Sequence, residues 1–158
     1  MWGDGMETMI RPATLEDARM IGENLREPDR REVEALGLRP LDAAVLSFYG
    51  SDLCFTGCID GTPSMIFGAG APLLSDTAWV WAVGTPRCDR APVAMVKVGR
   101  AVIARLLDVY PALENYCDAR YVKAHRWLEL LGFTLGEPEP YGPKRAMFRK
   151  LSIHRKEA

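Results

Sequence analysis

The sequence has no apolar run that approaches the roughly 18 residues needed for a membrane-spanning helix. Its first residues carry neither the basic nor the apolar segment of a secretory signal. It also lacks an excess of one charge, because 20 Lys and Arg stand against 21 Asp and Glu, for a net charge of −1. This balance removes the electrostatic argument for a nucleic-acid or membrane-surface partner. We therefore expect a cytoplasmic protein that binds neither nucleic acid nor membrane.

Cysteine is scarce, with four residues in the whole chain (Cys54, Cys58, Cys88 and Cys117). Their spacing fits no disulfide scaffold, and their neighbours are mostly aliphatic. A zinc set of the first two cysteines with His125 and His154 is the alternative. That set has a loose first spacing and no second close pair, so it makes a poor zinc pattern. We predict four reduced thiols and no metal site.

Several catalytic signatures are missing as well. The sequence contains no G-x-x-x-x-G-K-[ST] phosphate loop, no G-x-S-x-G nucleophile turn and no H-E-x-x-H metal helix. Gly68-x-Gly70 lies within a predicted strand that no helix follows, so it does not form a dinucleotide site.

What is present is the composition of an ordinary soluble domain: 158 residues, 48% hydrophobic and 26% charged. A chain of this length can build one full hydrophobic core without disulfide bonds or metal ions to stabilise it. We predict a single domain over residues 7–153. A ragged lead of residues 1–6 precedes it, and a polar tail of residues 154–158 follows.

The first half of the chain predicts a strand, a series of short helices and a hairpin. Thr14 is placed to cap the first helix, with Asp17 in its first turn. Asp29 is placed to cap a second helix that Gly37 ends. A third short helical segment follows over residues 40–47. Asp60-Gly61 then predicts a tight turn between strands 53–59 and 64–71.

The second half alternates strands and helices. We predict strands at residues 77–83, 113–118, 133–135 and 146–153, a long helix over 93–109 and a helix over 121–131 that Gly132 ends. A turn is expected over residues 137–143. The order β-α-α-β-β-β-α-β-α-β-β predicts an α/β fold with a mixed sheet and helices on both faces. The long helix would be a parallel crossover.

Two motifs in this order resemble the GNAT superfamily of N-acetyltransferases. Ile10-Arg11-Pro12-Ala13-Thr14-x-x-Asp17 is similar to the family's opening, and Ala124-x-x-Trp127-Leu128-Glu129-x-Leu131-Gly132-Phe133 is similar to its late helix and strand. The resemblance extends from Thr8 to Leu151 and implies a GNAT-like fold.

A narrower resemblance is to small GNAT-like proteins of short-tailed bacteriophages, in the group called internal virion protein A. This resemblance lies in the N-terminal motif over residues 10–17 and in residues 32–38, 46–50 and 126–128. It implies a virion or assembly role with a viral or host protein partner, in the host cytoplasm or the virion.

The GNAT resemblance implies acetyl-CoA as cofactor and places its site on one strand and the loop after it. The strand residues are Trp81, Ala82 and Val83, and the loop residues are Arg87, Cys88, Asp89, Arg90 and Ala91. The loop departs from the family pattern, because Cys88 replaces Gln or Arg and no glycine remains to let the backbone approach phosphate. Asp89 puts a negative charge there, which the two arginines oppose. Alternatively, Asp89 caps the long helix and both arginines point to solvent.

No catalytic residue is assigned from the sequence. Leu128 stands at the position where many GNAT enzymes have a Tyr that acts as the general acid. Neither Tyr116 nor Tyr121 is a clear substitute for it. His125 is expected on a helix surface, Trp127 as a buried anchor, and Trp79 with Trp81 in the core.

Two functions remain open. One is an N-acyltransferase that uses an acyl-CoA donor and an amine acceptor. The other is a catalytically degenerate phage protein that acts in virion assembly or host-protein binding.

Overall fold

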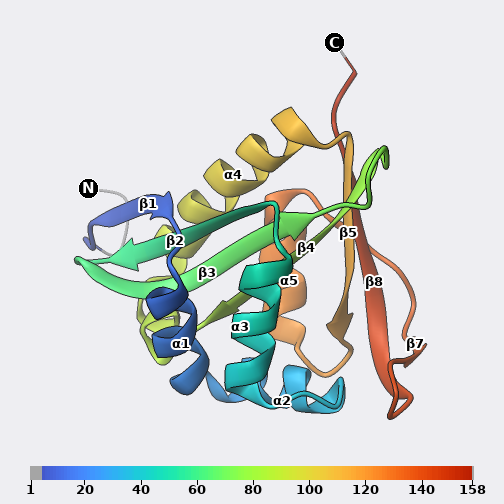
Figure 1. Ribbon diagram of the computed structural model, residues 1–158, viewed down its shortest axis with the longest axis horizontal. Coiled ribbons are helices and arrows are strands. Elements are labelled where there is room, and N and C mark those ends of the chain that lie inside the picture. The colour runs from blue at the N-terminus through green and yellow to red at the C-terminus, as the bar shows by residue number, and fades with distance from the viewer. Residues whose placement is uncertain (1–4, 158) are drawn as a thin grey trace.

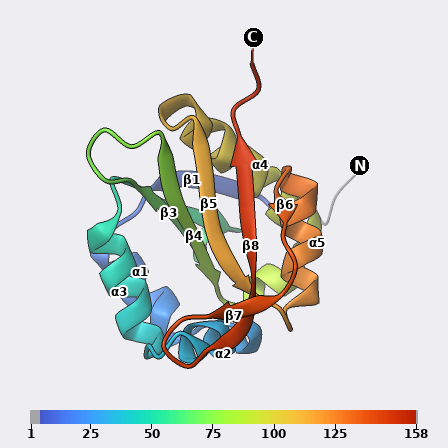
Figure 2. The ribbon, with the colours of Figure 1, turned by 90° about the vertical axis from the view of Figure 1, so that its right-hand side faces the viewer.

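A computed structural model describes residues 5–157 as one mixed sheet with helices on both faces (Figures 1 and 2). The strands are β1 (Thr8–Pro12), β2 (Leu53–Ile59), β3 (Thr62–Gly70), β4 (Thr77–Gly84), β5 (Ala112–Asp118), β6 (Thr134–Leu135), β7 (Glu139–Tyr141) and β8 (Ala146–His154). The helices are α1 (Leu15–Glu23), α2 (Glu27–Ala35), α3 (Pro40–Gly50), α4 (Pro92–Val109) and α5 (Val122–Leu131), with a 3-10 turn, η1 (Pro86–Arg90). The predicted fold class is confirmed.

The strand order is β1-β2-β3-β4-β5-β8-β6, with β7 paired to β8. Strands β1 to β4 pair antiparallel, and the predicted hairpin turns at Asp60 and Gly61, both with positive φ. β4 and β5 are parallel neighbours joined through α4, as the crossover prediction requires. β5 then pairs antiparallel with β8. One parallel pair therefore joins two antiparallel halves.

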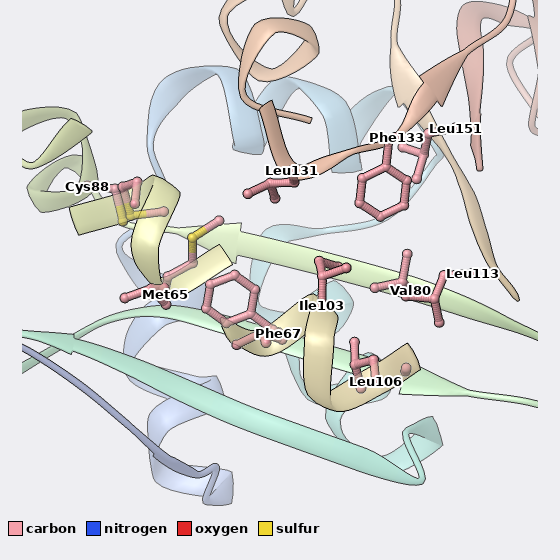
Figure 3. Close-up of a cluster of buried hydrophobic side chains, with 14 of the residues drawn as sticks. Met65, Phe67, Val80, Cys88, Ile103, Leu106, Leu113, Leu131, Phe133 and Leu151 are labelled. Atoms are coloured by element: carbon pink, nitrogen blue, oxygen red, sulfur yellow. The ribbon is translucent and has the colours of Figure 1, made fainter. Parts of the chain in front are cut away.

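Each face of the sheet has its own core. α4 and α5 cover a large cluster that includes Met65, Phe67, Ile103, Leu106 and Leu131 (Figure 3). A smaller cluster on the opposite face joins Ile21, Val33 and Ala43 to Ile66 and Val83. The sheet is thus buried on both sides, which explains why its central strands are apolar throughout rather than alternating.

Several predicted boundaries shift. α3 extends to Gly50, β8 to His154, and the expected turn over residues 137–143 contains the short strand β7. Met6, assigned to the lead, packs against the large core cluster; residues 1–4 of that lead lie outside the described residues.

Three predicted side-chain roles differ from the structure. Asp29 does not cap α2, because Arg26 is the N-cap residue and the Asp29 side chain is buried against β4. His125 is buried at 5% exposure instead of lying on the surface, and its Nε2 lies 2.9 Å from the carbonyl oxygen of Asp118. Trp127 is only half-buried, and its indole N–H donates to the carbonyl of Met95 at 3.0 Å.

The glycines of Gly68-x-Gly70 make room for tryptophans. Gly68 pairs across the strands with Trp81, and Gly70 with Trp79. A Cβ at Gly68 would lie 2.2 Å from the indole nitrogen of Trp81. The pair of glycines therefore has a packing role, which agrees with the exclusion of a dinucleotide site.

Asp17 fixes the start of α1 to the sheet. Its carboxylate accepts two hydrogen bonds from Arg11, at 2.6 and 2.9 Å, and one from the hydroxyl of Thr56 at 2.9 Å. Thr14 and Asp17 also form a reciprocal capping box, as the sequence predicts in part. Burial alone would raise the pKa of Asp17, but these bonds outweigh it and lower the pKa to about 2.

We expect Asp17→Asn to destabilise the protein at neutral pH by about 2 kcal/mol, because a cap and a charged pair are lost together. The folded pKa lies below the unfolded one, so the ionised carboxylate stabilises above about pH 4 and loses its effect as the pH falls towards 2. Urea unfolding should therefore show the difference from wild type shrinking over that range. Glu16→Gln, in the same turn but exposed, is the control; equal losses for both variants would contradict the argument.

Candidate functional site

The site lies where β4 and β5 separate. Their pairing is confined to Thr77–Trp79 and Ala112–Glu114. Past this point the Asn115 side-chain amide donates to the carbonyl of Val80, in place of a backbone partner. The two strands then diverge toward η1 and α5 (Figure 1). The divergence opens the middle of the sheet.

The open edge of β4 is already partly occupied. Strand alternation turns the backbone groups of Val80, Ala82 and Gly84 toward β5. The N–H of Gly84 donates to Asp29 at 2.7 Å, and its carbonyl accepts from the N–H of Arg26 at 2.9 Å. The start of α2 thus takes the place of a neighbouring strand at Gly84, which leaves Ala82 as the residue that faces the gap.

A cavity of about 380 Å³ fills the divergence and is lined from both faces of the sheet. One half is formed by α2, α3 and the outer parts of β4 and β5, including Glu32, Val33, Leu36, Leu38, Ala43, Ser47, Trp81 and Tyr116. The other half is formed by α4 and α5, including Met95, Gly99, Tyr121, Lys123, Arg126, Trp127 and Leu128. The cavity therefore connects two chemically different environments.

Glu32 brings a carboxyl group to the lining of the cavity. Its Oε2 accepts a hydrogen bond from the backbone N–H of Asp118 at 2.9 Å, and the Cys117 thiol bonds to it as well. Burial, together with the nearby charges of Asp29 and Asp118, raises the pKa of Glu32 to about 7, although the Asp118 bond opposes this. A carboxyl with that pKa can exchange protons near neutral pH.

Tyr121 lines the cavity near the same place. Burial raises the pKa of its phenol, and the hydrogen bond that it makes to Asp29 raises it further. The phenol therefore stays protonated and acts as a hydrogen-bond donor. Leu128, at the position where the resemblance implies a Tyr, also lines the cavity and has no titratable group.

Lys123 and Arg126 of α5 bring two cationic side chains to the lining of the cavity. The Lys123 ammonium lies 2.9 Å from the carboxylate of Asp89 on η1, and Arg26 reaches the same carboxylate at 3.5 Å. The alternative in which Asp89 caps the long helix is wrong, because no side chain caps α4 and Ala91 is its N-cap residue. Asp89 instead links η1 to α5 and α2.

The residues predicted to hold the cofactor divide into two groups. Trp81, Ala82, Val83 and Cys88 line the cavity, whereas Arg87, Asp89, Arg90 and Ala91 do not. The Cys88 thiol is buried and donates to the carbonyl of Ser64 at 3.2 Å, and Ala91 is fully buried. Arg90 is exposed and Arg87 half-buried. Whether these residues bind a cofactor stays a prediction.

Three residues of this site could not be recognised from the sequence. Glu32 precedes the buried Val33 on a short helix, Asn115 lies inside a strand, and Lys123 begins a helix. Each owes its place to a partner far along the chain. The one available signal was an acidic residue, Glu32, next to the apolar positions of a helix. Many surface helices have the same pattern, so it does not indicate a functional site.

The cysteine prediction agrees with the structure, in which all four are free and three are buried. Within residues 5–157 no group of three or more His, Cys, Asp or Glu could hold a metal ion. The described helices include none with the length and apolar character to cross a membrane.

No family model matches the sequence, and no curated protein matches it. Solved structures do match. A GNAT-family acetyltransferase from Bacillus anthracis has a TM-score of 0.70 at 10% identity, over 93% of this chain and 94% of that one. An aminoglycoside acetyltransferase in complex with coenzyme A has a TM-score of 0.68 at 18% identity, over 94% and 95%. The ribosomal-protein-S18-alanine N-acetyltransferase from Escherichia coli has a TM-score of 0.65 at 17% identity, over 96% of both chains.

These structures cover nearly the whole chain, so the protein has the fold of the GNAT acetyltransferases. The fold expected from the two motifs is confirmed. The identities are low enough that the likeness concerns the fold alone.

The raised pKa of Glu32 should make the free energy of unfolding depend on pH. Its folded pKa of about 7 lies above the ordinary value of 4.5, so the protein loses stability as the pH rises through this interval. Glu32→Gln removes the buried charge and keeps a hydrogen-bond acceptor. We expect the variant to gain about 2 kcal/mol relative to wild type between pH 5 and pH 8. Chemical denaturation measures this, with the exposed Glu34→Gln as control. A constant difference at both pH values would show that Glu32 titrates normally.

Proposed function

We propose that the protein is an N-acyltransferase that uses an acyl-CoA donor, acetyl-CoA in the simplest case, and a primary amine acceptor. The observation that carries the proposal is that the lining of one cavity holds both cations and a titratable carboxyl. Lys123 and Arg126 would attract an anionic donor, and Glu32 would attract a cationic amine. The GNAT fold, which the coenzyme A-bound aminoglycoside acetyltransferase shares, supports the same assignment.

The residues present fit coenzyme A in part. Ala82 has backbone groups facing the gap for the pantetheine arm, and the two cations of α5 suit its phosphates. The loop after β4 fits less well, because it has no glycine and Asp89 holds Lys123. We therefore expect weak binding. When bound, acetyl-CoA would supply an activated thioester.

Glu32 is the proposed base. In its ionised form it would take one proton from the ammonium group of the acceptor and leave a neutral amine nitrogen. That nitrogen would form the new C–N bond as the C–S bond of the thioester breaks, and the second proton that it loses would pass to the sulfur, so that the leaving group departs as the thiol of CoA. Its pKa of about 7 suits this role at neutral pH. Tyr121 stays protonated and would donate a hydrogen bond within the cavity.

Calorimetric titration with acetyl-CoA and with CoA, followed by an acetyl-transfer assay on a panel of primary amines, tests the proposal. Binding of both and transfer to an amine would support it. If neither binds at millimolar concentration, the acyl-CoA function fails.

The second candidate is a catalytically silent binding protein in virion assembly or host-protein binding, as the phage resemblance implies. The specific observation in its favour is the occupied edge of β4, where Arg26 and Asp29 bond both backbone groups of Gly84. Failure of CoA binding in the titration would favour this candidate. The phage resemblance itself, and any viral or host partner, stay predictions.

For activity, Glu32→Gln should lower kcat/KM by about 100-fold, because the variant cannot accept the acceptor's proton. The rise of wild-type activity through pH 7 should disappear in the variant. Initial rates over pH 6 to 9 measure both effects, and Glu34→Gln is again the control. A variant that keeps the wild-type pH profile would assign the base to another group.

For cofactor binding, Asp89→Asn should tighten CoA binding a few-fold, because it removes a negative charge and releases Lys123 from its ion pair. Lys123→Ala should weaken binding by a similar factor. Asp108→Asn, an exposed carboxylate near the far end of α4, controls for net charge. Calorimetry well below the melting transition measures all three. Weaker binding by Asp89→Asn would mean that Asp89 orients the cofactor loop.

A further inference from the structure

The half of the cavity on the α2 side has an aromatic and aliphatic wall. The register that pairs Trp79 with Glu114 places Trp81 and Tyr116 on the same face of the sheet, one on each side of the gap. Val33 and Leu36 close this space from α2, with Leu38 at its rim. An occupant of this half would contact aromatic rings and aliphatic side chains over most of its surface.

This wall is held in place by a second layer. The Tyr116 ring stacks on Tyr141 of β7, with centroids 3.8 Å apart and an angle of 12° between the planes. The loop after β7 packs against the end of α2, because a Cβ at Gly142 would lie 3.3 Å from Leu36. Tyr116 is therefore positioned before any ligand arrives.

In this half of the cavity, one carboxyl group, that of Glu32, has no cationic partner in the part of the chain that the structure describes and can pair with the ammonium group of a ligand. Among the described residues that line the cavity, the acids are Asp29 and Glu32. Asp29 is paired with Arg26 at 3.0 Å. Glu139, which bonds to the Tyr116 hydroxyl, lies outside the lining. One ammonium group would be matched by Glu32, and a second would be desolvated against apolar side chains without a partner.

We propose that the acceptor site binds a monoamine whose ammonium group is carried on an apolar, preferentially aromatic, body. Glu32 receives the ammonium group, and Trp81, Tyr116 and Leu36 enclose the body. Polyamines and aminoglycosides are disfavoured because their additional cations have no carboxylate to meet. The assignment deepens the acyltransferase proposed above and rests on it for turnover, although not for binding.

The test compares amines that differ by one charge. Calorimetry at pH 8 measures the binding of n-hexylamine, 1,6-diaminohexane and 2-phenylethylamine. Hexylamine should bind about tenfold more tightly than the diamine, and phenylethylamine at least as tightly as hexylamine. Equal or tighter binding of the diamine, or no monoamine binding at millimolar concentration, would overturn the assignment.

Two leucine variants test whether the preference for a monoamine over a diamine arises in this half of the cavity. Leu38 lies at the rim of the cavity with 40% exposure, and Leu41 lies outside the lining with 37% exposure. Both can accept a charge without burying it. Leu38→Asp should bring the affinities of hexylamine and diaminohexane together, whereas Leu41→Asp should leave their ratio at the wild-type value. An unchanged ratio in Leu38→Asp would place amine binding elsewhere.

Acetyl transfer to the same amines separates this proposal from the function on which it rests. Selective binding of monoamines without transfer contradicts the acyltransferase and leaves the amine site supported. Transfer that favours the diamine or spermidine supports the acyltransferase and overturns the apolar monoamine site.

Discussion

The early end of the pairing between β4 and β5 is the constraint on which the site depends. Three residues of each strand pair, and then the Asn115 side chain takes the Val80 carbonyl. Because the side chain satisfies that carbonyl, the strands can part without leaving it unpaired. The cavity, its access from both faces of the sheet and the meeting of α2 with α5 all follow from this separation. A continuous parallel sheet would fill the same space with backbone hydrogen bonds.

α2 closes the gap and changes its chemistry. Arg26 and Asp29 bond both backbone groups of Gly84, so the helix binds the strand edge as a neighbouring strand would. The same helix then brings Glu32 to the end of β5. This arrangement has opposite consequences for function. It supplies a carboxyl with a pKa near neutrality, yet it reduces the strand edge that a pantetheine arm could use. The two candidate functions differ in which consequence matters more.

Sequence reasoning succeeded where a signal was local and failed where a side chain had two possible partners. The Thr14 cap, the Asp60-Gly61 turn and the Gly132 helix end each depend on a few adjacent residues, and each is present. Asp29 was assigned as a cap, and a cap was one of the two alternatives for Asp89, because an acidic residue before a helix usually bonds its first turn. Both bond instead to groups more than 30 residues away. His125 was expected on a helix surface, but it is buried, with its Nε2 2.9 Å from the carbonyl oxygen of Asp118 at the end of β5.

The sequence by itself determined the fold: the order and type of the main elements, the hairpin, the parallel crossover and the similarity of two motifs to a known superfamily. These depend on periodicity and turn chemistry, which act over short stretches of chain. Only the tertiary structure decided the site. Glu32 acquires its raised pKa from burial beside Asp118, 86 residues away, and Lys123 is held by Asp89, 34 residues away. Desolvation and ion pairing depend on distance in space, so residues of ordinary appearance became the functional candidates once the chain had folded.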